Sequence, residues 1–226
     1  MVIEISAVEQ DRKGRKRYNI FTNGMEEPLF SVHEDLLIKH RLFKGTTLTT
    51  DEITEITEED DRYRAYALAI YYLGFKARTR KEIEQFLMRK AFESEPIAYT
   101  LERLESEHIV DDEEYARQFA KQRIRYSQKG SRWIKQELQQ RGVTNQAASE
   151  ALEAIDRDDE LASAIHAAKK KWRSLKGENR EKRQKLFSFL MRRGFPSDVV
   201  KEAAKSAIDE AEMEQVDDDD GLLLDN

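Results

Sequence analysis

Lysine and arginine recur at regular spacing in the middle of this sequence and give its clearest indication of function. The series runs at four-residue and then three-residue spacing through Arg117, Lys121, Arg125, Lys129, Arg132 and Lys135. Residues four apart lie on one face of a helix, so these side chains are expected to form a stripe on two adjoining helices. Residues 117–141 include eight basic residues and one acid, Glu137. Such a stripe is typical of a surface that binds a polyanion or an acidic protein face.

A second basic window extends the predicted contact surface. Residues 169–193 include eleven lysines and arginines against two acids. The remaining candidate contact residues from both windows are Arg141, Lys185, Arg192 and Arg193. Solvated helix faces without a partner are the alternative interpretation. Tyr126 and Trp133 flank the stripe and could stack on bases or guanidinium groups, although large aromatics at helical spacing favour a core position for Trp133.

Residues that usually carry catalysis are scattered. The four histidines include His33 and His40, seven residues apart, but no HExxH-type set accompanies them. The sequence has no cysteine, no Walker-type glycine loop and no Gly-x-Ser-x-Gly elbow. It therefore predicts no enzyme, no metal site, no cofactor and no small-molecule substrate.

Two acidic runs, at 111–114 and 217–220, could be imagined as divalent-ion sites because Mg²⁺ prefers oxygen ligands. Helix capping explains the first run better, with Asp111 or Asp112 as N-cap and two glutamates in the first turn. The second run is expected to be a solvated, disordered tail.

Composition favours long, solvated helices. Charged residues make up 37% and apolar residues 39%, with 9 glycines and 3 prolines. The net charge is −6, but nine acids lie after residue 207, so the preceding part carries +3. The absence of cysteine, of a signal-peptide pattern and of a long apolar run predicts a cytoplasmic protein without membrane association.

Three similar segments show that the chain is built from repeats. They are "ARTRKEIEQFLMRKAF" at 77–92, "KGSRWIKQELQQRGV" at 129–143 and "NREKRQKLFSFLMRRGF" at 179–195. Ile83, Ile134 and Leu186 align as buried positions, and Ala91, Gly142 and Gly194 align where each helix should end. Helical patterns flank each segment, so the unit is three helices, and tandem copies should stack because one copy buries little.

The first 50 residues differ from the rest, because "VIEISAV", "RYNIFT" and "LFSV" alternate as strands do, followed by a short helix at "HEDLLIKH". Thr50 is expected to be the N-cap of the next helix. Thr57 and Asp60 are expected to form a capping box at the start of the helix after it. The predicted fold is mainly α, with a tandem array of three three-helix repeats after a small β-rich unit. The predicted boundaries are 1–50 for the β-rich unit, 51–61 for an acidic helical linker, 62–110, 111–156 and 157–208 for the repeats, and 209–226 for the disordered tail.

The repeats and three stretches within them together resemble the RecX regulatory family over roughly residues 62–207. The stretches are "TRKEIEQFL" in the first repeat, "IVDDEEYARQFAKQR" where the first repeat meets the second, and "KGSRWIKQELQQRGV" in the second. The resemblance implies a non-enzymatic regulator of homologous recombination and the SOS response. Its expected partner is the RecA recombinase filament, whose groove it would occupy to limit recombinase and ATPase activity, with single- or double-stranded DNA as a further partner. The third segment departs from the pattern, because it lacks the glycine and tryptophan of "KGSRWI".

A direct DNA-binding helical-repeat module is the alternative function, supported by the same basic stripe. Against it stand the acidic net charge and the lack of an evident recognition helix with side chains set for base edges. A helical-repeat scaffold for another protein is the third possibility.

Overall fold

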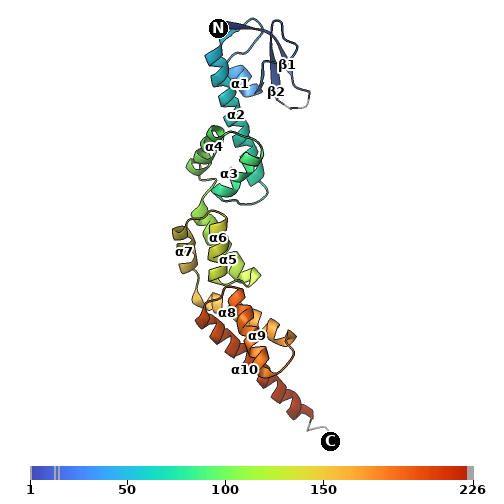
Figure 1. Cartoon of the computed structure of the whole chain (residues 1–226), viewed down its shortest axis with the longest axis vertical. Helices are drawn as coiled ribbons and strands as arrows, with labels where there is room; N and C mark the ends of the chain where they lie inside the picture. Colours follow the sequence, from blue (N-terminus) through green and yellow to red (C-terminus); the bar gives the residue numbers. More distant parts are fainter. Residues whose placement is uncertain (1, 13, 15, 223–226) are drawn as a thin grey trace. The chain divides into compact units, whose positions relative to one another are not determined.

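The computed structural model describes residues 2–12, 14 and 16–222, with side chains up to residue 213. The chain divides into two compact units (Figure 1). The first comprises Met1–Arg78 and Glu82–Val110, and the second comprises Thr79–Lys81 and Asp111–Asn226.

The first unit begins with a four-stranded antiparallel sheet. The strands are β1 (Val2–Gln10), β2 (Arg17–Thr22), β3 (Phe30–His33) and β4 (Thr47–Thr49), in the order β3-β2-β1-β4. In this register Val8 pairs with Ile20, Tyr18 with Val32 and Ile3 with Leu48. The short helix α1 (Glu34–Lys39) follows β3. Three strands and this helix were predicted from the sequence, whereas the three-residue β4 was not.

Helix α2 (Thr50–Leu73) is longer than its sequence pattern suggested. Thr49, not Thr50, is its N-cap: Thr49 Oγ1 accepts from the Glu52 N–H at 3.2 Å, and the Glu52 side chain accepts from the Thr49 N–H at 2.7 Å. The second start expected at Thr57 and Asp60 is wrong, because both residues lie inside α2. The predicted linker is therefore continuous with the first helix of the first repeat.

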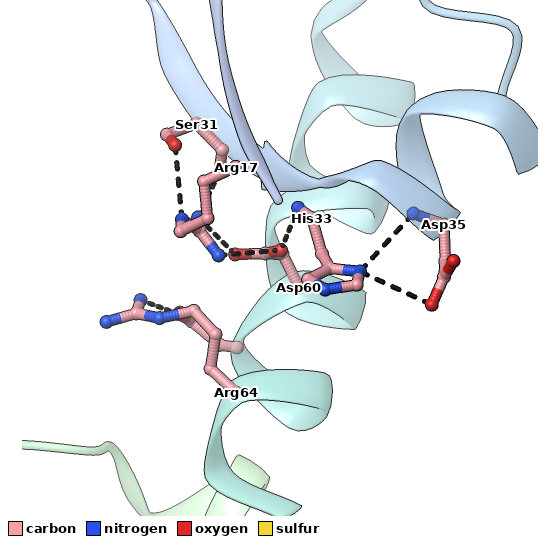
Figure 2. A network of polar contacts seen from close by, with 7 residues as sticks. Arg17, Ser31, His33, Asp35, Asp60 and Arg64 are labelled. Carbon is pink, nitrogen blue, oxygen red and sulfur yellow. Dashed lines mark hydrogen bonds and ion pairs between the residues drawn. The ribbon is translucent and has the colours of Figure 1, made fainter. Parts of the chain in front are cut away.

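Asp60 is 3% exposed. Figure 2 shows how it joins the sheet to α2. Its carboxylate accepts from Arg17 at 2.8 and 3.3 Å and from the His33 backbone N–H at 2.9 Å. Arg17 also donates to the Ser31 carbonyl at 2.7 Å. A buried carboxylate is stable only when such donors satisfy it, so this network holds the sheet on the helix.

The first repeat combines α2, α3 (Arg80–Arg89) and α4 (Ser94–Ser106). Its core is contiguous and aliphatic, formed by Ala65, Ala69, Ile83, Leu87, Ile97, Leu101, Leu104 and Val110. The sheet has a separate core around Ile5, Ile20 and Val32. The apolar positions at helical spacing thus face inward, as the sequence predicted.

The second unit contains the other two repeats. The second repeat comprises α5 (Asp112–Ser127), α6 (Ser131–Gln140) and α7 (Asn145–Glu153), and the third comprises α8 (Arg157–Ser174), α9 (Asn179–Arg192) and α10 (Ser197–Leu222). Asp111 caps α5 as predicted, accepting from the N–H groups of Glu113 and Glu114 at 2.9 Å each.

The aligned positions of the three repeats are structurally equivalent. Ile83, Ile134 and Leu186 are all 0% exposed, which confirms their predicted burial. The residues that follow the three helices adopt left-handed backbone, with φ of 61° at Ala91, 94° at Gly142 and 83° at Gly194. This is the usual C′ conformation, in which glycine avoids a Cβ penalty.

Gly130 allows the second and third repeats to approach at backbone distance. Its N–H donates to the Arg193 carbonyl at 2.9 Å, and the Arg132 N–H donates to the Gly194 carbonyl at 3.0 Å. A Cβ at position 130 would lie 2.3 Å from the Phe195 nitrogen.

Helix α10 continues through residue 222, into the stretch predicted to be disordered from residue 209. Two acids at its start pair with cations, Glu210 with Lys169 and Glu212 with Arg183, the latter at 3.4 Å. Ala207 and Ile208 are buried just before them. The prediction of disorder is therefore wrong for the start of this stretch, while residues 223–226 lie outside the described part of the chain.

We expect Asp60→Asn to destabilise the fold by about 3 kcal/mol, because Arg17 would keep a largely buried charge without its counter-ion. Asp61→Asn is the matched control, since Asp61 forms an exposed pair with Arg64 at 2.9 Å and should change stability by less than about 1 kcal/mol. Urea titration followed by circular dichroism measures both. Equal, small effects would show that Asp60 does not hold the sheet on α2.

Gly130→Ala should destabilise by roughly 1–3 kcal/mol, because the new Cβ must push the Gly194–Phe195 backbone away. Gly74→Ala serves as control, since Gly74 has ordinary helical φ of −59° and a Cβ there would meet the carbonyl oxygens of Tyr71 and Ile70, at 3.3 and 3.7 Å. Thermal unfolding of the two variants and the parent measures the loss of stability. A Gly130 variant as stable as the Gly74 variant would contradict the close-approach explanation.

Candidate functional site

The ten predicted contact residues separate into an internal group and an exposed group. All but Lys185, Arg192 and Arg193 belong to the second repeat or the turns beside its helices. Four of the ten are half-buried and hold contacts that fix the fold: Lys129, Lys135, Arg141 and Arg193. The others are exposed or half-buried at the surface.

Arg141 belongs to a polar cluster inside the second repeat. Glu137, whose side chain is 16% exposed, accepts from Arg123 at 3.1 Å and from Arg141 at 2.9 Å. Both guanidinium groups lie over the Phe119 ring, at 4.6 and 5.0 Å. Arg141 also donates to the Tyr115 hydroxyl at 3.2 Å. These contacts assign Arg141 a structural role in joining α5 to α6.

Arg193 is also structural. Its guanidinium donates to the carbonyls of Ser127 and Gln128, at 3.1 and 3.0 Å, where α5 ends. The last carbonyls of a helix lack partners within the helix, so an arginine from the third repeat satisfies them. Its planar group also lies 4.9 Å from the Phe189 ring centroid.

Lys129 and Trp133 cover each other. The Lys129 ammonium lies 4.1 Å from the Trp133 ring centroid, and the half-buried ring packs against the core of the second repeat. Burial lowers the pKa of Lys129, and the nearby charges of Arg193 and Arg123 act in the same direction. Lys135 donates to Ser149 Oγ at 2.9 Å. The structure therefore places Trp133 at the core, as the sequence favoured.

Six candidates remain at the surface. Arg117 pairs with Glu114 at 2.8 Å, and Lys185 with Glu181 at 3.3 Å, both as neighbours on one helix. The other four have no carboxylate at ion-pair distance among the described residues, and all are exposed: Lys121, Arg125, Arg132 and Arg192. Exposed cations without internal partners are the ones available to an external anion.

Two of these cations line a groove between α5 and α8. The groove has a volume of about 600 Å³ and is lined by Lys121, Gln122, Ile124, Arg125, Tyr126, Ala154, Ile155, Asp159, Ala162 and Ser163. Tyr126 is 75% exposed at this site. The second and third repeats both contribute walls, so the groove exists only because the two repeats are joined.

A second cleft lies between α8 and α9 in the third repeat. Its volume is about 610 Å³, and its lining includes Lys171, Glu181, Lys185, Ser188 and Arg192. Three cations face one acid, which is paired with Lys185. Lys171 was not predicted as a contact residue, although its place in the basic run at 169–173 could have indicated it.

Histidines and acids, the residues that could support catalysis or metal binding, make local contacts in the structure. His33 Nδ1 accepts from the Asp35 N–H at 3.3 Å, and His40 lies 2.8 Å from Glu59, so these two histidines serve local contacts. Within residues 2–12, 14 and 16–222 no group of three histidine, aspartate or glutamate side chains could hold a metal ion. No helix in this same part of the chain is long and apolar enough to cross a membrane.

Family models match each of the three repeats in turn. Residues 65–104 match the first three-helix domain of RecX, residues 111–152 the second and residues 158–204 the third. The matched ranges follow the repeats that the structure shows.

Curated relatives extend the similarity over most of the chain. The regulatory protein RecX of Oceanobacillus iheyensis is 33% identical over 201 residues, which cover 87% of this chain and 74% of the relative. The regulatory protein RecX of Listeria innocua is 32% identical over 212 residues, or 93% of this chain and 78% of the relative.

Two solved structures share the fold. A crystal structure of regulatory protein RecX superposes with a TM-score of 0.72 at 29% identity, covering 90% of this chain and 99% of that one. The crystal structure of RecX from Lactobacillus salivarius gives a TM-score of 0.61 at 25% identity, covering 66% of this chain and 97% of that one. With three matched domains in order and relatives above 30% identity over most of its length, the chain belongs to the RecX family of regulatory proteins.

Proposed function

We propose that this protein is a cytoplasmic, non-enzymatic regulator of homologous recombination and the SOS response that binds the groove of the RecA filament and inhibits its recombinase and ATPase activities. Membership of the RecX family is the observation that carries the proposal. The second support is the set of exposed cations on the second and third repeats that have no carboxylate partner among the described residues.

Such a regulator acts by differential binding. A surface that contacts neighbouring protomers stabilises the filament geometry that it fits, in proportion to the difference in affinity between the two geometries. Monomer exchange and access of a second DNA duplex then become less favourable. No bond is made or broken by the regulator, which is consistent with contact residues rather than catalytic ones at its surface.

Direct binding of DNA is the second candidate function, and the cleft between α8 and α9 favours it. Lys171, Lys185 and Arg192 converge there with the hydroxyl of Ser188, a combination that suits phosphate oxygens. Within the filament these cations would face DNA phosphates, and in the alternative they would bind free DNA. Comparison of RecA filaments with naked single-stranded DNA separates the two.

We expect the triple variant Lys121→Glu, Arg125→Glu and Arg132→Glu to inhibit strand exchange and filament ATP hydrolysis roughly tenfold less well than the parent. The new carboxylates would face an acidic surface of the filament, and the like charges would repel each other. All three side chains are exposed, so the fold should remain within about 1 kcal/mol of the parent. The measurement uses RecA filaments assembled in advance. A variant with the same charge change in the first unit is the control: Lys44→Glu, Lys76→Glu and Arg89→Glu.

If the reversed variant inhibits as well as its parent while folded, the contact face lies elsewhere and the cleft around Lys185 and Arg192 is the next to change. If the chain instead coats free DNA, the same substitutions should lower the slope of log affinity against log salt by roughly 0.7 for each lost single-strand phosphate contact.

A further inference from the structure

We propose that the groove between α5 and α8 is an anchor pocket that receives one apolar side chain from an acidic segment of the RecA protomer. This inference rests on the proposed function and specifies the contact. The groove has an apolar floor and a cationic rim, and the occupant that we infer is a protein segment.

The floor of the groove is apolar and held in place. Ile124 is 3% exposed, and Ile155, Ala154 and Ala162 surround the hollow from the opposite side. Ser163 Oγ on α8 donates to the Ile124 carbonyl on α5 at 2.7 Å, which ties the two walls together. The volume of about 600 Å³ lies within the usual range for binding pockets. The hollow therefore exists before any partner binds.

The rim carries net positive charge on one side. Lys121 and Arg125 lie one turn apart on α5, are exposed and have no carboxylate at ion-pair distance among the described residues. Asp159 is the acid among the lining residues and stands on the α8 wall. A bound segment should therefore direct its own carboxylates toward α5, where they gain partners, and away from α8.

Tyr126 adds a contact surface beside the rim. It is 75% exposed, and tyrosine is among the residues enriched at binding hot spots. Tyr126 and the two cations of the rim could also contact a nucleic acid, but the aliphatic floor gives a base no hydrogen-bond partner and suits an apolar protein side chain better. The chemistry points to an apolar anchor flanked by acids.

Filling the groove tests the anchor directly. Ala162 is exposed on α8, and Ala162→Trp should occupy the hollow and weaken binding to pre-assembled RecA filaments at least tenfold, or about 1.4 kcal/mol. The salt dependence should stay unchanged, because no charge is altered. Ala98→Trp is the matched control, since Ala98 is also an exposed alanine on a helix, in the first unit. Co-sedimentation at several salt concentrations measures the affinities.

Neutralising the rim tests the acidic flank. Lys121→Gln with Arg125→Gln should weaken binding at low salt and reduce the slope of log affinity against log salt, while leaving the apolar contribution at high salt. Both side chains are exposed, so this variant should fold and can test the inference even if Ala162→Trp does not fold.

Three outcomes overturn the inference in distinguishable ways. Filament binding by Ala162→Trp equal to that of the parent would show that the groove is not a contact. An equal loss of affinity for naked single-stranded DNA would show that the groove serves nucleic acid. A parent chain that fails to sediment with RecA filaments would overturn the proposed function itself, and the anchor with it.

Discussion

The backbone contact at Gly130 is the constraint on which the second unit depends. Hydrogen bonds from Gly130 and Arg132 to the carbonyls of Arg193 and Gly194 require the two backbone segments to meet without an intervening side chain. Once they meet, the Ser131 N–H donates to the buried Glu160 carboxylate at 2.7 Å, and Arg193 reaches the end of α5. Each of these contacts links the second repeat to the third. The groove with its cationic rim is a consequence of that junction.

Much of this fold could be predicted from the sequence, because repetition and helix-end chemistry are local signals. The aligned apolar positions, the left-handed residues after each helix and the Asp111 cap follow from spacing of a few residues. Asp60 could not be assigned in that way. Its partners, Arg17 and His33, are 43 and 27 residues away, and only the packed sheet brings them to it.

The contact surface was harder to predict than the fold, because a basic residue looks alike in the sequence whether it faces solvent or a neighbouring carbonyl. Arg141 and Arg193 belong to the basic windows, yet aromatic rings, carbonyls and one half-buried glutamate hold them. The single acid of the first window, Glu137, was the available signal. An isolated glutamate among many cations is more readily an internal counter-ion than a surface residue.

The Arg17 and Asp60 network also determines how the sheet can meet other proteins. β3 lies at one end of the sheet, where backbone groups are ordinarily open to another strand. Here the Ser31 carbonyl is taken by Arg17 and the His33 N–H by Asp60. An incoming strand would have to displace a buried ion pair to extend the sheet at this edge. The β3 edge is thus protected against edge-to-edge association, and recognition at β3 would have to use side chains rather than main-chain pairing.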